Sequence, residues 1–483
     1  MPKAPALLTD LYQLTQAQAY FQNGLVDWDG SFYLHFRANP FGGGYTLACG
    51  MAQIAEMIED FSFTVDDLDY LASLPSASGA ALFRPDFLDY LGAMRLGLDI
   101  DAVKEGVPVF PYEPIVRISG PLMQAQLMET ALLNQVGFQS LVATKAARIC
   151  DVAKGPVAEF GLRRAQGPAG GIFAARAACV GGCSSTSDVE AGRRFGLPVS
   201  GTHAHSWVMA HLDELAAFRA FSLGMPEGCV LLVDTYEVER GIQNAVTVAL
   251  EMEQRGQRLA GIRIDSGDLA WYSKRARLLL DAAGLDYVKI IVSNDLDEYA
   301  IQSLRDQGAC IDSWGVGTRL VTAYEEPALS AVYKLSAVRR SKHEAWMPTM
   351  KISAQLAKAT LPGLLDVRRY HDEEQNIVGD MIYRLDAPPS DDLVIDPLDK
   401  LRRKRLPSGR YVQLLEPLAR GGKVLWPQLS VAEIQQTAKR NLQCLDASCR
   451  RFLNPHSYVV GLEPGLHNQR DQLRSQLHGV DLE

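Results

Sequence analysis

The stretch CVLLVDTYEVERGIQNAVTVALEMEQRGQRLAGIRIDSGD, residues 229–268, decides the predicted fold. Its apolar start, Cys229–Val233, predicts a buried strand, and the amphipathic run Val238–Gln254 predicts a helix. A second apolar run, Leu259–Ile264, predicts the next strand. Because strand–helix–strand connections within one sheet are almost always right-handed crossovers, we expect the two strands to lie parallel.

The same pattern continues toward the carboxyl end of the chain. Helices are predicted at Ala270–Ala283 and Asp295–Gln307, and strands at Val288–Val292 and Cys310–Val316. Repeated strand-then-helix units indicate a parallel sheet. The expected fold class is α/β: an irregular TIM-like α/β barrel, an α+β domain formed by the N-terminal and C-terminal flanks, and a helical C-terminal tail.

The length of 483 residues suggests about three structural units. We expect residues 1–130 to form the N-terminal part of the α+β domain and residues 131–340 to form the catalytic barrel. Residues 341–427 are expected to return to the α+β domain, and residues 428–483 to form the helical C-terminal segment. The basic run 400–410 is expected to be a solvated loop or strand edge.

The composition is that of a globular protein, with 47% hydrophobic and 22% charged residues. The net charge of -9 should repel nucleic acid and anionic membrane surfaces, so we do not expect the protein to bind either. No apolar run is long enough for a membrane helix, and the N-terminus does not resemble a signal peptide. The eight cysteines include no CxxC pair, which excludes a zinc ribbon and favours a reduced, cytoplasmic protein.

Polar residues follow four of the predicted strands. Such residues often only cap the next helix. Four clusters in succession favour a shared site instead, because parallel strands bring their carboxyl ends to one edge or face. The clusters are Asp234-Thr235-Tyr236, Asp265-Ser266-Gly267-Asp268, Ser293-Asn294-Asp295 and Gly315-Val316-Gly317-Thr318.

A histidine motif, Gly201-Thr202-His203-Ala204-His205-Ser206, opens a helical pattern that is expected to end near Ser222. The N-terminus of a helix can bind an anion, and a neutral histidine there can act as a nucleophile. A capping turn at Thr202 would give the same pattern. An HxH metal pair is a further alternative, weakened because no histidine lies between His211 and His343.

Arginines and glycines supply the other candidates for anion binding. Arg163 and Arg164 lie in a glycine-containing segment, where they could hold a phosphate or be solvated in a turn. Arg263 and Asp265 should share one side of a strand, as a salt bridge or as a grip on a hydroxylated, phosphorylated ligand. The metal ligands are unknown from the sequence. Asp234 or Asp268 could bind Mg²⁺.

Seven motifs in order resemble nicotinate phosphoribosyltransferase, a type II phosphoribosyltransferase family. The likeness runs from about Leu8 to residue 370, with a weaker match near Asn454. The motifs are Thr9 to Thr15, Phe36 to Gly42, Phe160 to Gly167, Gly201 to Ser206, Arg263 to Asp268, Ser293 to Asp295 and Gly315 to Thr318.

The resemblance implies that nicotinate and 5-phosphoribosyl 1-pyrophosphate react to give nicotinate mononucleotide and pyrophosphate in NAD biosynthesis. It implies an ATP-dependent ligase with ATP as co-substrate, Mg²⁺ as cofactor, and a homodimer with shared active sites. His205 and Asp265 are the implied catalytic residues, and His205 is the implied phosphohistidine, which leaves His203 dispensable. The implied substrate-binding residues are Tyr12 (from the partner subunit), Phe160, Arg163, Ser187, Thr202, Arg263, Asn294, Gly315, Gly317 and Thr318.

Two departures and three rival functions accompany this resemblance. The family often has an acidic residue where Ala169 stands and Asn where Asp188 stands, which affects only loop geometry. A nicotinamide phosphoribosyltransferase would carry an acidic residue where Ser187 aligns. A catalytically silent nucleotide-binding homologue is disfavoured because His205 and Asp265 are present, and a barrel metal hydrolase because histidines are missing.

Overall fold

The computed structural model describes residues 6–353 and 359–477, which divide into two compact units. The first unit comprises residues 1–141, 328–429 and 436–483, and the second comprises residues 142–327 and 430–435. The chain passes from the first to the second within helix α6 (Glu129–Ala153). Within the described ranges, no helix is long and apolar enough to span a bilayer.

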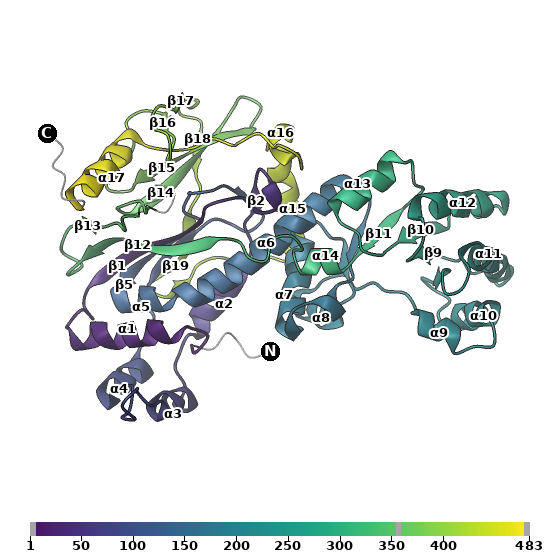
Figure 1. Ribbon diagram of the computed structural model, residues 1–483, viewed down its shortest axis with the longest axis horizontal. Helices are drawn as coiled ribbons and strands as arrows, with labels where there is room; N and C mark the ends of the chain where they lie inside the picture. Colours follow the sequence, from purple (N-terminus) through teal and green to yellow (C-terminus); the bar gives the residue numbers. More distant parts are fainter. Residues whose placement is uncertain (1–5, 354–358, 478–483) are drawn as a thin grey trace. The chain divides into compact units, whose positions relative to one another are not determined.

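The second unit contains a six-stranded sheet whose pairings are all parallel (Figure 1). The strand order is β7-β6-β11-β10-β9-β8, so β7 and β8 are the edge strands. The strands are β6 (Val157–Glu159), β7 (Ser185–Thr186), β8 (Val230–Leu232), β9 (Gly261–Ile264), β10 (Lys289–Val292) and β11 (Ser313–Val316). This mixed α/β arrangement confirms the predicted class at the level of a parallel sheet with connecting helices.

The elements predicted between residues 229 and 316 are all present, with small shifts at their ends. Helix α11 covers Val238–Gln254, as the amphipathic pattern predicts, and it packs closely on the sheet. A Cβ atom on Gly241 would lie 1.9 Å from the carbonyl oxygen of Val233, so only glycine permits this approach. The other helices are η2 (Leu162–Arg164), α7 (Gly167–Val180), α8 (Val189–Phe195), α9 (His205–Met209), α10 (Glu214–Gly224), α12 (Leu269–Ala282), α13 (Glu298–Asp306) and α14 (Thr318–Val321).

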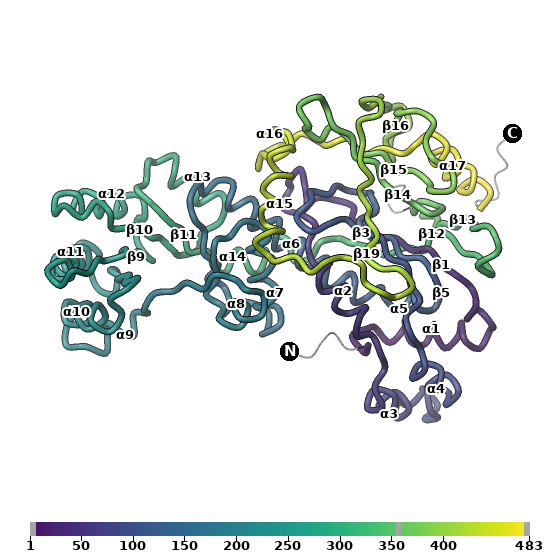
Figure 2. The backbone as a smooth tube through the Cα atoms, turned by 180° about the vertical axis from the view of Figure 1, so that it is seen from behind, coloured from purple at the N-terminus to yellow at the C-terminus, as the bar shows by residue number. Residues whose placement is uncertain are grey.

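The first unit combines segments that are far apart in the sequence. Strand β1 (Asp29–Phe36) pairs antiparallel with β12 (Ala331–Arg339) and with β5 (Val116–Pro121). Figure 2 shows β3 (Asp99–Ala102) beside β19 (Glu416–Arg420), which are also antiparallel neighbours. The two larger sheets have the orders β13-β12-β1-β5-β3-β19-β20 and β17-β16-β21-β15-β14-β18. A third sheet has two antiparallel strands, β2 (Thr46–Leu47) and β4 (Pro108–Val109).

Short helices and strands complete the first unit. Helix α5 packs against β1 and β5, and α1 packs on α5. The helices are α1 (Leu11–Gln22), η1 (Pro40–Gly42), α2 (Met51–Asp60), α3 (Val65–Ser73), α4 (Pro85–Ala93), α5 (Leu122–Leu127), α15 (Val431–Gln443), which begins in the second unit, α16 (Ala447–Arg450) and α17 (Pro464–Leu477). The remaining strands are β2 (Thr46–Leu47), β4 (Pro108–Val109), β13 (Met347–Pro348), β14 (Leu365–His371), β15 (Ile377–Arg384), β16 (Leu393–Ile395), β17 (Arg403–Arg405), β18 (Tyr411–Gln413), β20 (Lys423–Val424) and β21 (Val460–Leu462).

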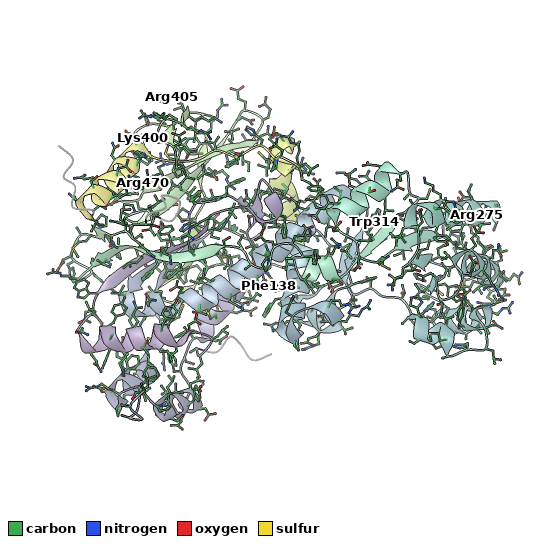
Figure 3. All side chains as sticks on the ribbon, in the orientation of Figure 1. Phe138, Arg275, Trp314, Lys400, Arg405 and Arg470 are labelled. Atoms are coloured by element: carbon green, nitrogen blue, oxygen red, sulfur yellow. The ribbon has the colours of Figure 1, made fainter. Side chains whose placement is uncertain are left out.

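The basic run 400–410 lies at the surface of the first unit, where Lys400 and Arg405 point outward (Figure 3). Its central part is β17, a fully exposed strand at one edge of a sheet. Charged side chains on an edge strand disfavour pairing with another chain. The expectation of a solvated strand edge is confirmed.

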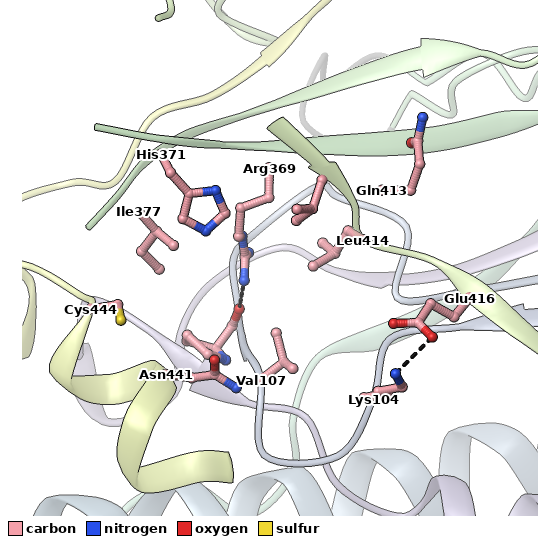
Figure 4. Close-up of a pocket in the computed structure, with 12 residues that line it drawn as sticks. Lys104, Val107, Arg369, His371, Ile377, Gln413, Leu414, Glu416, Asn441 and Cys444 are labelled. Carbon is pink, nitrogen blue, oxygen red and sulfur yellow. Dashed lines mark hydrogen bonds and ion pairs between the residues drawn. The ribbon is translucent and has the colours of Figure 1, made fainter. Parts of the chain in front are cut away.

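A cavity of about 160 Å³ in the first unit contains no unpaired lysine or arginine among the described residues that line it (Figure 4). Arg369 donates to the carbonyl oxygen of Pro108 at 2.7 Å and forms a two-bond ion pair with Asp380. Lys104 pairs with Glu416 at 2.7 Å. Because both cations already have partners, this cavity is a weak candidate for binding a phosphorylated ligand.

Glu113, a buried residue whose carboxylate lies 3.7 Å from Nη2 of Arg369, makes the stability of the first unit depend on pH. Burial and the nearby Asp380 raise the pKa of Glu113 well above its usual value. The folded protein therefore binds this proton more tightly than the unfolded chain does. The stability that the group contributes is complete below its unfolded pKa and is lost as the pH rises toward the folded pKa.

We expect Glu113→Gln to remove part of this loss, because glutamine keeps the shape of the neutral carboxyl group. The free energy of unfolding of the wild type should fall by up to about 1.4 kcal/mol per pH unit from this group, and the variant should lack that slope. Urea unfolding of both proteins between pH 5 and pH 8 checks this. An identical dependence on pH in the two proteins would contradict it.

Candidate active site

Arg263 is the centre of a polar cluster at the carboxyl ends of the parallel strands. Only 12% of its side chain is exposed. Nε donates to Ser293 Oγ at 2.8 Å, and Nη1 donates to Thr202 Oγ1 at 3.1 Å. Nη2 lies 3.2 Å from Asp265 Oδ1, and the guanidinium carbon lies 5.5 Å from the centroid of the Phe160 ring. The structure thus brings together four of the residues singled out from the sequence.

Two further side chains hold Asp265 in place. The Ser293 hydroxyl donates to Asp265 Oδ1, so Ser293 links this carboxylate to Arg263. Asp234 Oδ2 accepts hydrogen bonds from the backbone N–H of Asp265 at 3.0 Å and from the Ser266 hydroxyl at 2.7 Å. From the sequence, Asp234 was predicted to belong to the polar residues after the strands and to be a possible Mg²⁺ ligand. Its observed contacts connect the ends of β8 and β9.

The carboxylates at the strand ends do not form a ready metal site. Asp268 caps helix α12, where its Oδ1 accepts the N–H of Trp271 at 3.0 Å. Asp234 is 9% exposed, and its Oδ1 has no hydrogen-bonding partner in the described part of the chain. Across residues 6–353 and 359–477, no group of three or more His, Cys, Asp or Glu could hold a metal ion. One free carboxylate oxygen fits only an ion that brings its other ligands with it.

The histidine motif does not open one long helix. Helix α9 covers only His205–Met209, and a second helix, α10, starts at Glu214. The expectation of a single helix to Ser222 is wrong, because Asp213 caps the new helix by accepting the N–H of Ala216 at 2.8 Å. A helix of five residues has a small dipole, so the helix dipole alone does not make this segment an anion site.

The two histidines of the motif have different surroundings. His205 is half-buried, and its Nδ1 lies 3.2 Å from the hydroxyl of Thr235, just after β8. His203 is buried, and its Nε2 accepts the backbone N–H of Leu232 at 3.0 Å. With Nε2 occupied by a backbone donor, His203 cannot use that nitrogen to bind a metal, and the HxH alternative fails.

Phe160 and Ser187 follow neighbouring strands. Glu159, at the end of β6, pairs with Thr186, at the end of β7, so the next residue on each strand lies at the same edge of the sheet. Glu159 is buried and accepts the backbone N–H of Gly161 and the hydroxyl of Thr186. Burial raises the pKa of Glu159. No role was predicted for this carboxyl group, because nothing in the sequence pattern marks it as interior.

Glycine 315 is required by the position of Phe160. A Cβ atom on Gly315 would lie 2.7 Å from Phe160 Cδ2, so any other residue would displace the ring. Gly317 precedes α14, and the half-buried Thr318 begins that helix. Asn294 is exposed and has φ 123°, a backbone region that favours glycine. Such an outlier is common at functional sites.

The remaining candidates lie outside the cluster around Arg263. Arg163 is exposed in η2 and makes no ion pair within the described chain. Asp188 caps α8 by accepting the N–H of Ala191 at 3.0 Å, a role that asparagine also fills. Ala169 is exposed in the first turn of α7. Neither departure from the family pattern disturbs a residue of the cluster.

Tyr12 belongs to the first unit. It is 50% exposed on α1, and its hydroxyl donates to Glu129 Oε2 at 3.1 Å. Burial and the charge of Glu129 raise the pKa of Tyr12 to about 12. Glu129 also lines a cavity of about 330 Å³ together with Lys334 and Lys351, neither of which belongs to a motif seen in the sequence.

A parallel sheet with a cationic and aromatic cluster at its strand ends places the protein in the class of α/β enzymes. Three family models match along the chain. They describe the N-terminal domain (residues 7–137), the family itself (residues 156–376) and the C-terminal domain (residues 366–470) of nicotinate phosphoribosyltransferase. The chain belongs to the nicotinate phosphoribosyltransferase family.

Similar proteins cover nearly the whole chain. Nicotinate phosphoribosyltransferase of Bacillus subtilis is 42% identical over 463 residues, which are 95% of this chain and 92% of that protein. The Caenorhabditis elegans enzyme is 33% identical over 95% of this chain and 92% of its own length. The crystal structure of human nicotinic acid phosphoribosyltransferase has a TM-score of 0.84 and 31% identity, covering 96% of this chain and 99% of that one.

Proposed function

We propose that this protein joins nicotinate to 5-phosphoribosyl 1-pyrophosphate, giving nicotinate mononucleotide and pyrophosphate, in NAD biosynthesis in the cytoplasm. The observation that carries the proposal is the cluster of Arg263, Phe160, Thr202 and Asp265 in a chain of this family. Purified protein supplied with ring-labelled nicotinate and the pyrophosphate substrate should form a labelled mononucleotide. Failure to form product with any pyridine would refute the proposal.

Nicotinate is a flat anion, and the cluster offers a matching surface. The guanidinium of Arg263 can pair with the carboxylate, and the Phe160 ring can stack on the pyridine. The Thr202 hydroxyl accepts a hydrogen bond from the same guanidinium and donates to the carbonyl oxygen of His203 at 3.1 Å, so it helps to hold the guanidinium in place. Because Asp265 and Ser293 fix the guanidinium, little conformational entropy is lost when the substrate binds.

The phosphoribosyl group is assigned to the neighbouring strand ends. Departure of pyrophosphate from an oxocarbenium-like ribose needs cations and N–H donors. Arg163 supplies an exposed cation, and Asn294 and the loop Gly315–Thr318 supply polar and backbone groups. We propose that Asp265 stabilises the positive charge that develops on the ribose. Mg²⁺ would arrive with the pyrophosphate and water, and the free Oδ1 of Asp234 fits it as a single protein ligand.

ATP is proposed as co-substrate, with transfer of its γ-phosphoryl group to His205. The half-buried ring of His205, whose Nδ1 lies 3.2 Å from the Thr235 hydroxyl, supports this assignment. A hydroxyl at Nδ1 fixes the ring orientation and leaves Nε2 free to attack phosphorus. Charge on phosphorylated His205 would then alter the affinity of the strand ends for pyrophosphate.

A homodimer with shared active sites is proposed from Tyr12 and the cavity beside it. Tyr12 is half exposed although it is aromatic, and Lys334 and Lys351 line a 330 Å³ cavity with Glu129. An aromatic ring and two lysines suit a phosphorylated pyridine ligand. We propose that these groups complete the site of a partner subunit.

We also propose that residues 131–340 form the catalytic domain. Residues 1–130, 341–427 and 428–483 would then support it.

The sheet of the second unit is proposed to belong to an irregular TIM-like barrel. One segment touches both of its edge strands. Val199 forms a parallel bridge with Thr186 on β7, and His203 accepts the N–H of Leu232 on β8. A segment that spans from one edge to the other can stand in for the missing strands of a closed barrel.

The choice between acid and amide is assigned to Ser187, which follows β7 as Phe160 follows β6. A serine hydroxyl can donate to the carboxylate of nicotinate, whereas an aspartate would repel it. Like charges at about 4 Å cost on the order of 4 kcal/mol at an effective dielectric constant near 20. Solvent and Arg263 reduce this value.

We expect Ser187→Asp to lower kcat/KM for nicotinate by at least about tenfold, roughly 1.4 kcal/mol. Any gain with nicotinamide should be smaller, because the rest of the pocket remains suited to an anion. The control Ser187→Ala removes the hydroxyl without adding charge. An unchanged ratio of kcat/KM for the two substrates in Ser187→Asp would mean that Ser187 is only a turn residue.

A further inference from the structure

His203 lies in the loop between the bridge at Val199 and helix α9, and its ring is almost fully enclosed. Only 7% of the residue is exposed, and the ring meets Phe221 of α10 edge-on at 4.7 Å. Nε2 accepts the N–H of Leu232, so the proton of the neutral ring must be on Nδ1. Nδ1 lies 3.3 Å from the carbonyl oxygen of Ala204 and donates to it.

The N–H of Leu232 faces the open edge of the sheet. Among the described residues, strand β8 pairs only with β9, and the N–H of Val233 donates to the carbonyl oxygen of Arg263 in that strand. Because successive residues of a strand point their N–H groups to opposite edges, Leu232 has no strand partner on its side. Leu232 is 1% exposed, so its N–H group depends on the ring of His203 for a partner.

His203 lies between Thr202 and His205 in the sequence, and both of these residues belong to the proposed site. Thr202 accepts from Arg263, and His205 lies against Thr235, which follows Leu232 by three residues. The hydrogen bond from Leu232 therefore fixes the loop to the same stretch of chain that orients His205.

We propose that His203 is a positioning residue that sets His205 for phosphorylation by accepting the backbone N–H of Leu232 at the open edge of the sheet. The inference rests on the proposed phosphohistidine and differs from the sequence-based expectation that His203 is dispensable. His203 does not touch the phosphoryl group. It acts by holding the backbone between Thr202 and His205.

Two variants of His203 distinguish the role of its hydrogen-bond acceptor, Nε2, from the role of its ring in packing. His203→Phe keeps an aromatic ring against Phe221 but removes the acceptor, and His203→Gln places an acceptor oxygen near the position of Nε2. With γ-labelled ATP in a single turnover, His203→Phe should phosphorylate His205 at least tenfold more slowly than the wild type. His203→Gln should stay within threefold of the wild type, as should the control His211→Phe, which changes a half-buried histidine of the same segment whose Nδ1 lies 2.8 Å from the carbonyl oxygen of Trp207.

A wild-type rate in His203→Phe would overturn the proposal, and so would equal slowing in His203→Phe and His203→Gln. Labelling the nine histidines with ¹⁵N tests the hydrogen bond between the N–H of Leu232 and His203 Nε2 without relying on activity. The ring signal that disappears in His203→Gln should report a protonated Nδ1 and an unprotonated Nε2. A protonated Nε2 would show that His203 does not accept this hydrogen bond, and would overturn the proposal. If the wild type takes up no label from ATP while this signal is found, the proposed phosphorylation of His205 is refuted, whereas the hydrogen bond from Leu232 to His203 is confirmed.

Discussion

Replacing Arg263 by alanine is expected to lower kcat/KM for nicotinate by about 2–5 kcal/mol, which is roughly 30-fold to several thousand-fold. The side chain is mostly buried and contacts Ser293, Thr202 and Asp265 together. Its loss removes the cation that pairs with the substrate carboxylate and leaves the carboxylate of Asp265 without its partner. Initial rates measured with both substrates varied give the effect.

Arg163→Ala is the matched control for Arg263→Ala, because it removes an exposed arginine on the side assigned to phosphoribosyl pyrophosphate. It should raise the KM for that substrate and leave the KM for nicotinate near the wild-type value. If both variants raised the same KM, the assignment of the two substrates to different sides of the strand ends would be wrong.

His205→Ala should abolish phosphorylation by ATP and leave a slow transfer that does not depend on ATP. The nucleophilic nitrogen is lost, whereas the cluster around Arg263 does not include this ring. Incubation with γ-labelled ATP should give the wild type an acid-labile, base-stable label. Equal labelling of His205→Ala would refute the assignment of His205.

Much of the second unit follows from local sequence patterns. The apolar runs before Asp234 and Asp265 form buried parallel strands, and Val238–Gln254 forms a helix, because each pattern has one clear period and glycine or polar residues at its ends. The polar residues after the strands therefore meet, as parallel strands require. Asp265 was identified in this way, and Arg263 was identified as its neighbour on the same side of the strand. Thr202 was identified from the histidine motif and the family resemblance.

The contacts that complete the cluster depend on tertiary structure. Ser293 was seen as one polar residue after a strand, and only the packing of β9 beside β10 shows that it joins Arg263 to Asp265. From the sequence, His203 was a possible metal ligand. In the structure its Nε2 accepts the backbone N–H of Leu232 on the edge strand β8, which no local pattern predicts. The break between α9 and α10 had a local signal in Asp213, which the helical periodicity of the segment obscured.

Release of pyrophosphate by the purified wild-type protein tests the central claim most directly. The protein is supplied with 5-phosphoribosyl 1-pyrophosphate, Mg²⁺ and ATP, and with nicotinate, nicotinamide or quinolinate in turn. Nicotinate should give a kcat/KM at least about tenfold above either other pyridine, because Arg263 and Ser187 favour a single ring carboxylate. Release with nicotinamide at an equal or greater kcat/KM, or no release with any of the three, would contradict the account.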